Sequence, residues 1–345
     1  MINALQKQSC VNRKASRKRL FANSVALAIC FFGTCLSHAQ EIQRVNITKS
    51  VVYVQTNAST TILNPRPPGP DYGGPFGFAA DVVGEALSSI SPPGLVLAAG
   101  SGFNSPAEFN GYLAYNSDSE QWAFGNVHAD NYAATSQAEI DSLFANGLYR
   151  LTVMGKTLNL NLTGNAFPNT PVATLSGGAW SNGRYVLDPR TAFSVRTSAF
   201  SGYGSHADDA IVIQVSGATT LMSLHSTAPG SNWLSRTVPP NTFPSGTTSI
   251  VAMAFIVMVS KDTTTLPDTN SLCFAGYSKW TVVEVVTLPE VTLKPADNNT
   301  VEVTFTGILQ ESEDLETWSD VTPQPTSPWQ CSMSGGNRFF RAKTN

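Results

Sequence analysis

The sequence predicts an all-β protein with two β-sandwich domains, Ig-like or jelly-roll-like, followed by a small C-terminal β module. Three observations predict this class. Short stretches with a residue period of two recur along the chain, turns rich in Gly, Pro, Asn and Asp separate them, and only residues 136–145 show helical spacing. Many short strands with hardly any helix are typical of sandwich folds.

The first 39 residues have the features of a secretory signal peptide. Six basic residues come first, an apolar run follows from Leu20 to Leu36, and Ser37-His38-Ala39 offers small residues for cleavage after Ala39. We therefore expect an exported protein, either extracellular, at the cell surface or periplasmic. A retained membrane anchor is the alternative, since the apolar run is close to the shortest length that spans a bilayer. After cleavage we expect no membrane span.

The chain that remains after cleavage is acidic. Removing the six basic residues of the signal peptide from a total of 21 Lys and Arg leaves 15, against 24 Asp and Glu. Such a chain offers no basic stripe to a phosphate backbone, so we expect no nucleic-acid partner.

The first expected domain covers residues 40–167. A Pro- and Gly-rich stretch, 64–77, can be neither helix nor central strand and separates the first alternating segment from the second. The expected strands are 40–55, 78–82, 112–115, 121–124, 149–153 and 158–162, the last two forming a hairpin at Gly155-Lys156.

Residues 136–153 carry the clearest local sequence signals of this domain. Ser136 can cap a helix while Glu139, three residues on, reaches back to a free backbone amide. Asn146-Gly147 tolerates positive φ and ends the helix. Beyond it Tyr149, Leu151 and Val153 alternate as a strand. We interpret the carboxylates of this unit as helix-terminus groups rather than catalytic ones.

The second expected domain covers residues 168–288, after a proline-containing boundary at 165–171. Its expected strands are 185–187, 193–197, 211–215, 249–259 and 279–287. The run at 249–259 is apolar on both faces and predicts a central strand buried on both sides. Residues 289–345 form the C-terminal module. A segment this short buries only a marginal core, so we expect it to pack against the neighbouring domain.

Two parts of the chain resemble exported β-sandwich proteins of planctomycete and verrucomicrobial bacteria. One is AEIDSLFANGLYRLTV with the later GGAWSNGRYVLDPRTAFSVRTSAF and DDAIVIQVSG. The other is ILQESEDLETWSDV with the terminal RFFRA, which is similar to the closing module of those proteins. The resemblance implies fold and export, with Asp314, Leu315, Trp318, Phe339, Phe340 and Arg341 as framework residues. It implies no activity.

Aromatic residues near turns are the candidate ligand-binding groups. Exposed rings beside Gly-, Ser- and Asn-rich turns could stack on sugar faces, and such positions are held by Trp180, Tyr203, Trp233, Tyr277 and Trp280. Of these we take Trp180, Tyr203 and Trp233 as the candidate ligand-binding residues. The alternative is core or edge packing, because sandwich cores regularly bury tryptophan.

Catalytic and metal interpretations have weaker support. His206-Ala207-Asp208-Asp209 could supply metal ligands or could be a turn whose Asp caps backbone amides. Residues 116–120 space oxygen ligands as calcium loops do but lack the glycine and the glutamate in register. A glycosidase would need two facing carboxylates, for which Glu139, Asp141, Asp188, Asp208 and Asp209 are available. We assign no catalytic residue, no metal and no cofactor.

Two cysteines remain after cleavage, Cys273 and Cys331. Export permits a disulfide between them, and two buried free thiols are the alternative.

The sequence thus favours an exported, non-enzymatic protein for surface structure, adhesion or binding, with a polysaccharide or another surface protein as partner. A carbohydrate-binding module protein is the alternative, and a secreted hydrolase with a divergent site is the second alternative.

Overall fold

The computed structural model describes residues 42–65, 74–103, 109–117, 120–124, 132–206, 208–216, 221–226, 231–266, 271–297, 300–332 and 337–343. The expected signal peptide, 1–39, lies outside these ranges. The described chain is all-β: strands dominate, accompanied by the α-helix α2 (Gln137–Leu143) and the single-turn 3₁₀ helix η2 (Leu87–Ser89).

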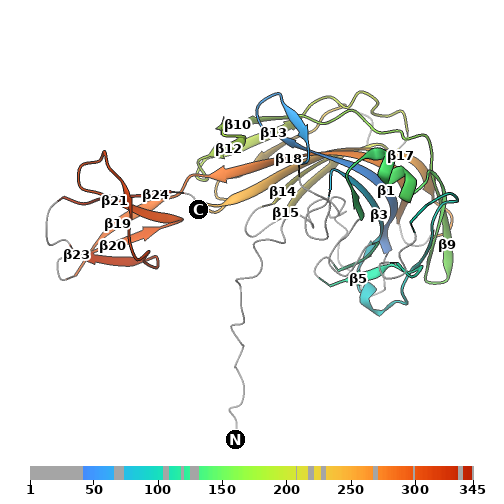
Figure 1. Ribbon diagram of the computed structural model, residues 1–345, viewed down its shortest axis with the longest axis horizontal. Coiled ribbons are helices and arrows are strands. Elements are labelled where there is room, and N and C mark those ends of the chain that lie inside the picture. Colours follow the sequence, from blue (N-terminus) through green and yellow to red (C-terminus); the bar gives the residue numbers. More distant parts are fainter. Residues whose placement is uncertain are drawn as a thin grey trace, which may run out of the picture.

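One large, curved sheet runs through the body of the molecule (Figure 1). Its strands lie in the order β15 (Leu221–Ser226), β14 (Ala210–Ser216), β17 (Thr248–Asp262), β18 (Leu272–Thr287), β1 (Ile42–Gln55), β3 (Phe76–Gly84), β6 (Gln121–Ala123) and β5 (Ala114–Asn116). Four further strands extend it: β2 (Thr61–Leu63) on β1, β7 (Tyr132–Ala134) on β3, and β12 (Arg184–Leu187) with β11 (Gly178–Ser181) on β18.

Two three-stranded sheets belong to the two halves of the body. The first contains β4 (Gly94–Val96), β8 (Gly147–Val153) and β9 (Lys156–Leu162). The second contains β10 (Ala173–Ser176), β13 (Phe193–Thr197) and β16 (Ser235–Val238). Side chains of each small sheet share a hydrophobic core with side chains of the large sheet. Each half is therefore a sandwich with its own core.

The large sheet crosses the expected domain boundary at residue 167. That position separates β9 from β10 and so divides the two small sheets, but β1 of the first half pairs in parallel with β18 of the second, from Arg44↔Leu272 to Val54↔Val282. The structure therefore differs from two independent sandwiches. Local alternation in the sequence predicts that a strand forms but not which strand it pairs with. This pairing joins residues more than 200 positions apart.

The long strands β17 and β18 explain why both cores can share one sheet. β17 is buried along Ser249–Met258, which confirms the expected central strand. Odd-numbered residues of β18 face both sandwich cores: Tyr277 lies in the first and Val283 in the second. On β17, Ala252 and Ala254 face the opposite side, where a separate apolar cluster forms.

The predicted helix–strand unit is confirmed. Ser136 caps α2 by accepting a hydrogen bond from Glu139 N at 3.2 Å. β8 and β9 form the predicted hairpin, and Val153 pairs with Lys156. Met154 and Gly155 make its two-residue turn with φ of 49° and 75°, as a type I′ turn requires.

The C-terminal module follows β18 and contains two three-stranded sheets, β19 (Val291–Ala296), β20 (Thr300–Phe305) and β23 (Trp329–Ser332), and β22 (Ser319–Asp320), β21 (Ile308–Ser312) and β24 (Phe339–Lys343). It lies at one end of the body (Figure 1) and has its own small core around Val303 and Leu309. At the junction, Arg190 of the body lies 3.5 Å from the Glu290 carboxylate of the module. Within the module, Glu290 N donates to Thr306 Oγ1 at 3.0 Å.

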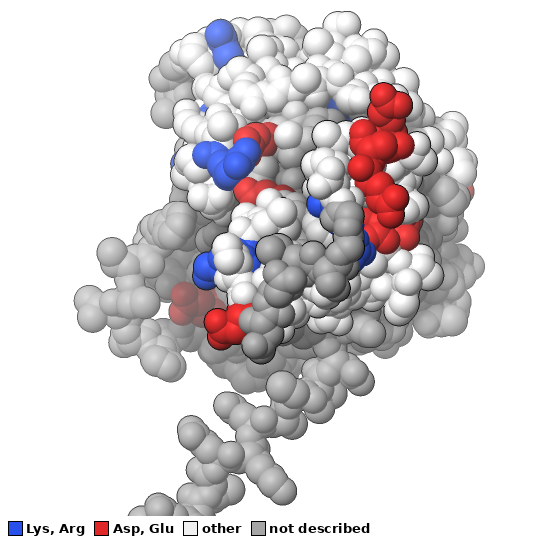
Figure 2. Space-filling view, turned by 90° about the vertical axis from the view of Figure 1, so that its left-hand side faces the viewer, with Lys and Arg blue, Asp and Glu red and all other residues white. Residues whose placement is uncertain are grey.

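The module end of the molecule carries a stripe of acidic side chains (Figure 2). Several acidic residues of the module have local structural partners. Asp314 accepts hydrogen bonds from Thr317 N and Glu316 N, both at 2.8 Å, and from Ser312 Oγ. These donors lower the pKa of Asp314 to about 2. The Ser-x-Asp-Leu segment is thus a self-bonded turn.

The disulfide between Cys273 and Cys331 is not formed: both thiols are free and buried. Cys273 lies near the start of β18, in the core of the first sandwich, while Cys331 lies in the core of the module, which is attached at the far end of the same strand. At about 3.3 Å per residue, the distance from Cys273 to Thr287 along β18 is about 46 Å. Burial raises the pKa of the Cys273 thiol to about 12.

Candidate binding groove at Tyr112

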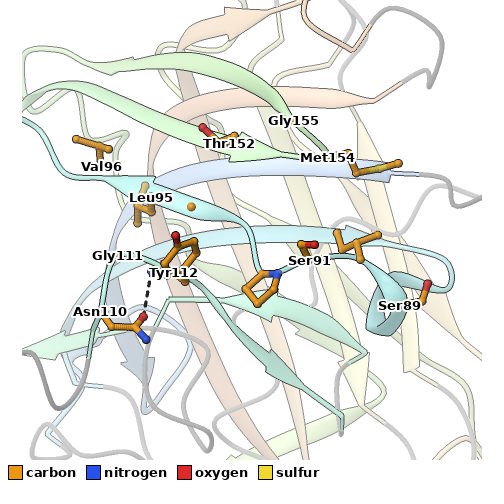
Figure 3. A pocket seen from close by; sticks show the side chains of 13 residues that line it. Ser89, Ser91, Leu95, Val96, Asn110, Gly111, Tyr112, Thr152, Met154 and Gly155 are labelled. Carbon is orange, nitrogen blue, oxygen red and sulfur yellow. Dashed lines mark hydrogen bonds between the residues drawn. The ribbon is translucent and has the colours of Figure 1, made fainter.

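An open groove of about 820 Å³ lies on the outer side of the first small sheet (Figure 3). It is lined by residues from η2 to β4, by the segment before β5, and by the end of β8. These are Ser89, Ile90, Ser91, Pro92, Gly94, Leu95, Val96, Asn110, Gly111, Tyr112, Thr152, Met154 and Gly155. None of the described residues that line it has a charged side chain, so this part of the groove offers apolar surface with hydroxyl and amide groups.

Tyr112 is the aromatic residue of the groove, and backbone contacts fix its position. Leu95 N donates to Gly111 O and Leu113 N donates to Pro93 O, both at 2.8 Å, so residues 111–113 lie along the edge of β4. Gly94, which bridges to Tyr112, has no side chain there, and the tyrosine ring passes within 3.9 Å of the position a Cβ would take. The residue as a whole is 56% exposed.

Polar groups flank the ring on both sides. Asn110 Oδ1 accepts a hydrogen bond from Tyr112 N at 3.2 Å, drawn as a dashed line in Figure 3. Across the groove, Thr152 Oγ1 lies 2.9 Å from Thr157 Oγ1 of the neighbouring strand. Met154, in the hairpin turn, and Val96 are 52% and 57% exposed. The surface therefore combines a ring, two flexible or branched apolar groups and neutral hydrogen-bonding groups.

The three aromatic residues that the sequence favours lie on the second half of the body. Tyr277 and Trp280, which the sequence also offers, are buried on β18 and present no ring to solvent. Trp180, on β11, is half-buried and packs edge-to-face on Tyr185 with ring centroids 5.5 Å apart. The guanidinium of Arg196 lies 3.9 Å from the ring centroid of Trp233. Tyr203 packs on Phe200 at 5.6 Å.

Two of these residues come close together through Phe200. Phe200 N donates to Asn232 O at 2.7 Å, next to Trp233, and Tyr203 N donates to Phe200 O. Trp180 packs instead against the core of the second sandwich, which contains Tyr185. The described structure therefore places the three rings in two neighbourhoods, and all three are half-buried rather than fully presented to solvent.

The His206 segment is a turn that backbone amides stabilise. Asp209, only 1% exposed, accepts hydrogen bonds from Gly204 N and His206 N at 3.2 Å. Asp208 pairs with Lys261 at 3.0 Å. Among the residues that the structure describes, no three metal-ligating side chains form a group. Of the calcium-like segment 116–120, residues 118 and 119 lie outside the described chain.

The other three carboxylates that the sequence offers for a glycosidase site, Asp188, Glu139 and Asp141, each have a structural partner. Asp188 pairs with Arg190 at 2.7 Å, and Arg190 lowers the pKa of Asp188 to about 2. Glu139 accepts hydrogen bonds from Thr135, and Asp141 pairs with Lys49.

Comparisons with known proteins assign no family. No family model matches the chain, and no curated protein is similar to it. The solved structures that resemble it include the chicken CNTN1 FN1–FN3 domains (9% identity, 89% of this chain and 90% of that one, TM-score 0.20), a tetra-tandem repeat from the extending region of a large adhesion protein (10%, 87% and 66%, 0.20), and a 1.5-MDa bacterial ice-binding adhesin (11%, 83% and 85%, 0.21). At these TM-scores the likenesses carry no argument. Within the described residues, no helix has the length and apolar character needed to cross a membrane.

Proposed function

We propose that this is an exported, non-enzymatic binding protein whose groove at Tyr112 holds a neutral polysaccharide. The observation that carries the proposal is the uncharged lining around a half-exposed ring. Sugars present apolar C–H faces and many hydroxyl groups, so a ring beside hydroxyl and amide side chains suits both parts. The open shape suits a chain that continues beyond the groove on either side.

Binding to a surface protein is the second candidate, and exposed apolar side chains favour it. Val96 and Met154 in the groove, with Leu148 at 41% exposure on the same strand as Thr152, form part of the outer surface of the first small sheet. Solvent-exposed apolar groups that lie close together mark interaction surfaces. The two candidates differ in what the Tyr112 ring contributes.

The test is a pull-down of the exported protein on insoluble neutral glycans, such as cellulose, chitin and mannan, with alginate as the charged comparison. We expect retention on a neutral glycan that salt leaves unchanged, because none of the described residues that line the groove is charged. Tyr112→Ala should weaken retention about tenfold through lost ring contact. The exposed ring has few packing contacts to lose, so unfolding should stay at the wild-type temperature.

Trp233→Ala and Trp180→Ala are the matched controls, since both remove a ring from the other half of the body. Loss of retention in either of them, with Tyr112→Ala unaffected, would move the site to the second sandwich. If no neutral glycan retains the wild-type protein, polysaccharide binding is wrong. A different pattern would instead favour the protein partner. In that case cells still retain the Tyr112→Ala variant but no longer retain a variant that carries both Val96→Ser and Met154→Ser.

A further inference from the structure

Lys49 is a buried lysine at the centre of a polar cluster in the first sandwich. Its side chain is 0% exposed, and its register partner across β1 and β18 is the fully buried Tyr277. Lys49 Nζ donates hydrogen bonds to Asp141 Oδ1 at 2.6 Å and to Asn146 Oδ1 at 2.9 Å. One amine thus contacts a carboxylate and a carboxamide at the same time.

The carboxamide of Asn146 is held on both of its polar atoms. Tyr277 OH donates to Asn146 Oδ1 at 3.0 Å, so the carbonyl oxygen accepts from Lys49 and Tyr277 together. Asn146 Nδ2 donates to Asn165 Oδ1 at 2.9 Å, and Asn165 Nδ2 donates to Asp141 Oδ2 at 3.1 Å. The amide, the amine and the carboxylate therefore form a closed set of contacts.

We propose that Lys49 and Asn146 join in an intramolecular isopeptide bond, with Asp141 carrying the protons. Asp141 takes one proton from the Lys49 ammonium, and the free amine attacks Cγ of Asn146. Asp141 passes this proton to the departing nitrogen, and the Cγ–Nδ2 bond breaks. The second proton that Nζ loses on becoming an amide nitrogen follows through the same carboxylate to the released ammonia. One Nζ–Cγ amide forms, one ammonium ion leaves, Asp141 is again a carboxylate, and no electron transfer is involved.

The geometry supplies what each step needs. The amine is held 2.9 Å from the carbonyl oxygen, one bond away from the carbon that it attacks, as a positioned nucleophile should be. Tyr277 donates to the oxygen on which negative charge develops. Burial raises the pKa of Tyr277 to about 12, so its hydroxyl keeps the proton that it donates.

Burial also prepares the nucleophile. It lowers the pKa of Lys49 below the ordinary value, against the opposing effect of the Asp141 charge, which favours transfer of a proton to the carboxylate. Asn146 is exposed in the short segment between α2 and β8, so ammonium has a path to solvent. The bond would tie β1 to the helix–strand unit, across 97 positions of the chain.

The test is a peptide map of the folded, exported protein after complete denaturation and trypsin digestion. We expect a branched peptide that contains both Lys49 and Asn146, lighter than the two linear parts by one ammonia, with no cleavage after Lys49. Intact mass alone does not decide, since cyclisation of an N-terminal Gln40 and succinimide formation at Asn146-Gly147 each lose one ammonia as well. Neither of these produces a branch.

Two variants separate the roles of the residues. Asp141→Ala keeps both reacting groups and should yield only linear peptides, while Gln137→Ala removes a 3.3 Å contact to the other Asp141 oxygen and should keep the branch. Linear peptides alone from the folded wild type, even after prolonged incubation, would overturn the proposal. A branch at Asp141 with loss of water would overturn Asn146 as the electrophile, and a branch in Asp141→Ala would overturn the proton carrier.

Discussion

At the scale of single residues, the best-defined local interaction is the cap of α2. Ser136 Oγ accepts from Glu139 N, and the Glu139 carboxylate in turn accepts from Thr135 N at 2.8 Å and from Thr135 Oγ1 at 2.6 Å. The reciprocal hydrogen bond that the sequence predicts for Glu139 therefore forms, with the backbone amide of Thr135 as its donor. The hydrogen bonds from Thr135 lower the pKa of Glu139 below its ordinary value of 4.5.

Glu139→Ala should reduce the free energy of unfolding by about 1 kcal/mol at pH 7, as loss of a cap does. A folded pKa below the unfolded one means that this stabilisation is present above the unfolded pKa and is lost as the pH falls through the folded value. Urea unfolding of both proteins at pH 7 and at about pH 3 measures it. A difference that stays constant between the two pH values would show that the charged carboxylate is not the cause.

Lys49 shows how far single residues can be predicted from sequence. It follows Val45 and Ile47 at a period of two, so the pattern alone places a lysine on the core-facing side of β1. That lysine signals a buried charge with a partner, but the sequence does not indicate which one. Asp141 and Asn146, almost a hundred positions away, become its partners only through the packing of α2 on the sheet.

At the scale of elements, the pairing of β17 with β18 depends on a close backbone approach at Gly276. The register between these strands shifts between Met258 and Ser260, which marks a bulge in β17. A Cβ added at Gly276 would lie 2.4 Å from Val257 O, on the backbone of the neighbouring strand. Glycine is therefore required there because another strand occupies the space.

Gly276→Ala should destabilise the body by about 3 kcal/mol, because the backbone of β17 must move to admit one methyl group. The matched control is Gly94→Ala, where the nearest atoms lie 3.9 Å from the added Cβ and no contact is crowded. Thermal unfolding followed by circular dichroism compares the two variants with wild type. Equal midpoints for both variants would contradict the assigned contact.

Most of the expected strands of the fold lie where the period of two predicted them. The hairpin β8–β9 and the buried β17 were predictable because local alternation and turn residues specify them. The groove could not be predicted in this way, because the sequence around Tyr112 predicts the start of a short strand. The exposure of Tyr112 depends on the contact between residues 111–113 and β4. The glycine at position 94 and the turn residues Asn110-Gly111 are the sequence features that could have indicated this contact.

At the scale of the whole molecule, β18 belongs to both sandwiches and to the junction with the module. Its first part pairs with β1, its last part pairs with β12, and its whole length pairs with β17. Each half of the body therefore lacks part of its core without this strand. The module, by contrast, closes its own core around Val303 and Leu309.

This arrangement predicts which pieces of the chain fold alone. A chain that ends after Leu288 keeps the large sheet and both cores, and loses only junction contacts such as that between Arg190 and Glu290. Its unfolding should remain a single cooperative transition within about 3 °C of wild type, since 1 kcal/mol shifts the midpoint of a domain of this size by about 2–4 °C.

A chain that ends after Phe167 contains the whole first expected domain but lacks β18. β1 then loses its parallel partner, and the first core is left without Cys273, Ala275 and Tyr277. We expect no cooperative thermal transition and no near-ultraviolet circular dichroism for this fragment. If it unfolds cooperatively with a native-like spectrum, the first sandwich does not need β18, and the boundary at 167 divides two independent domains after all.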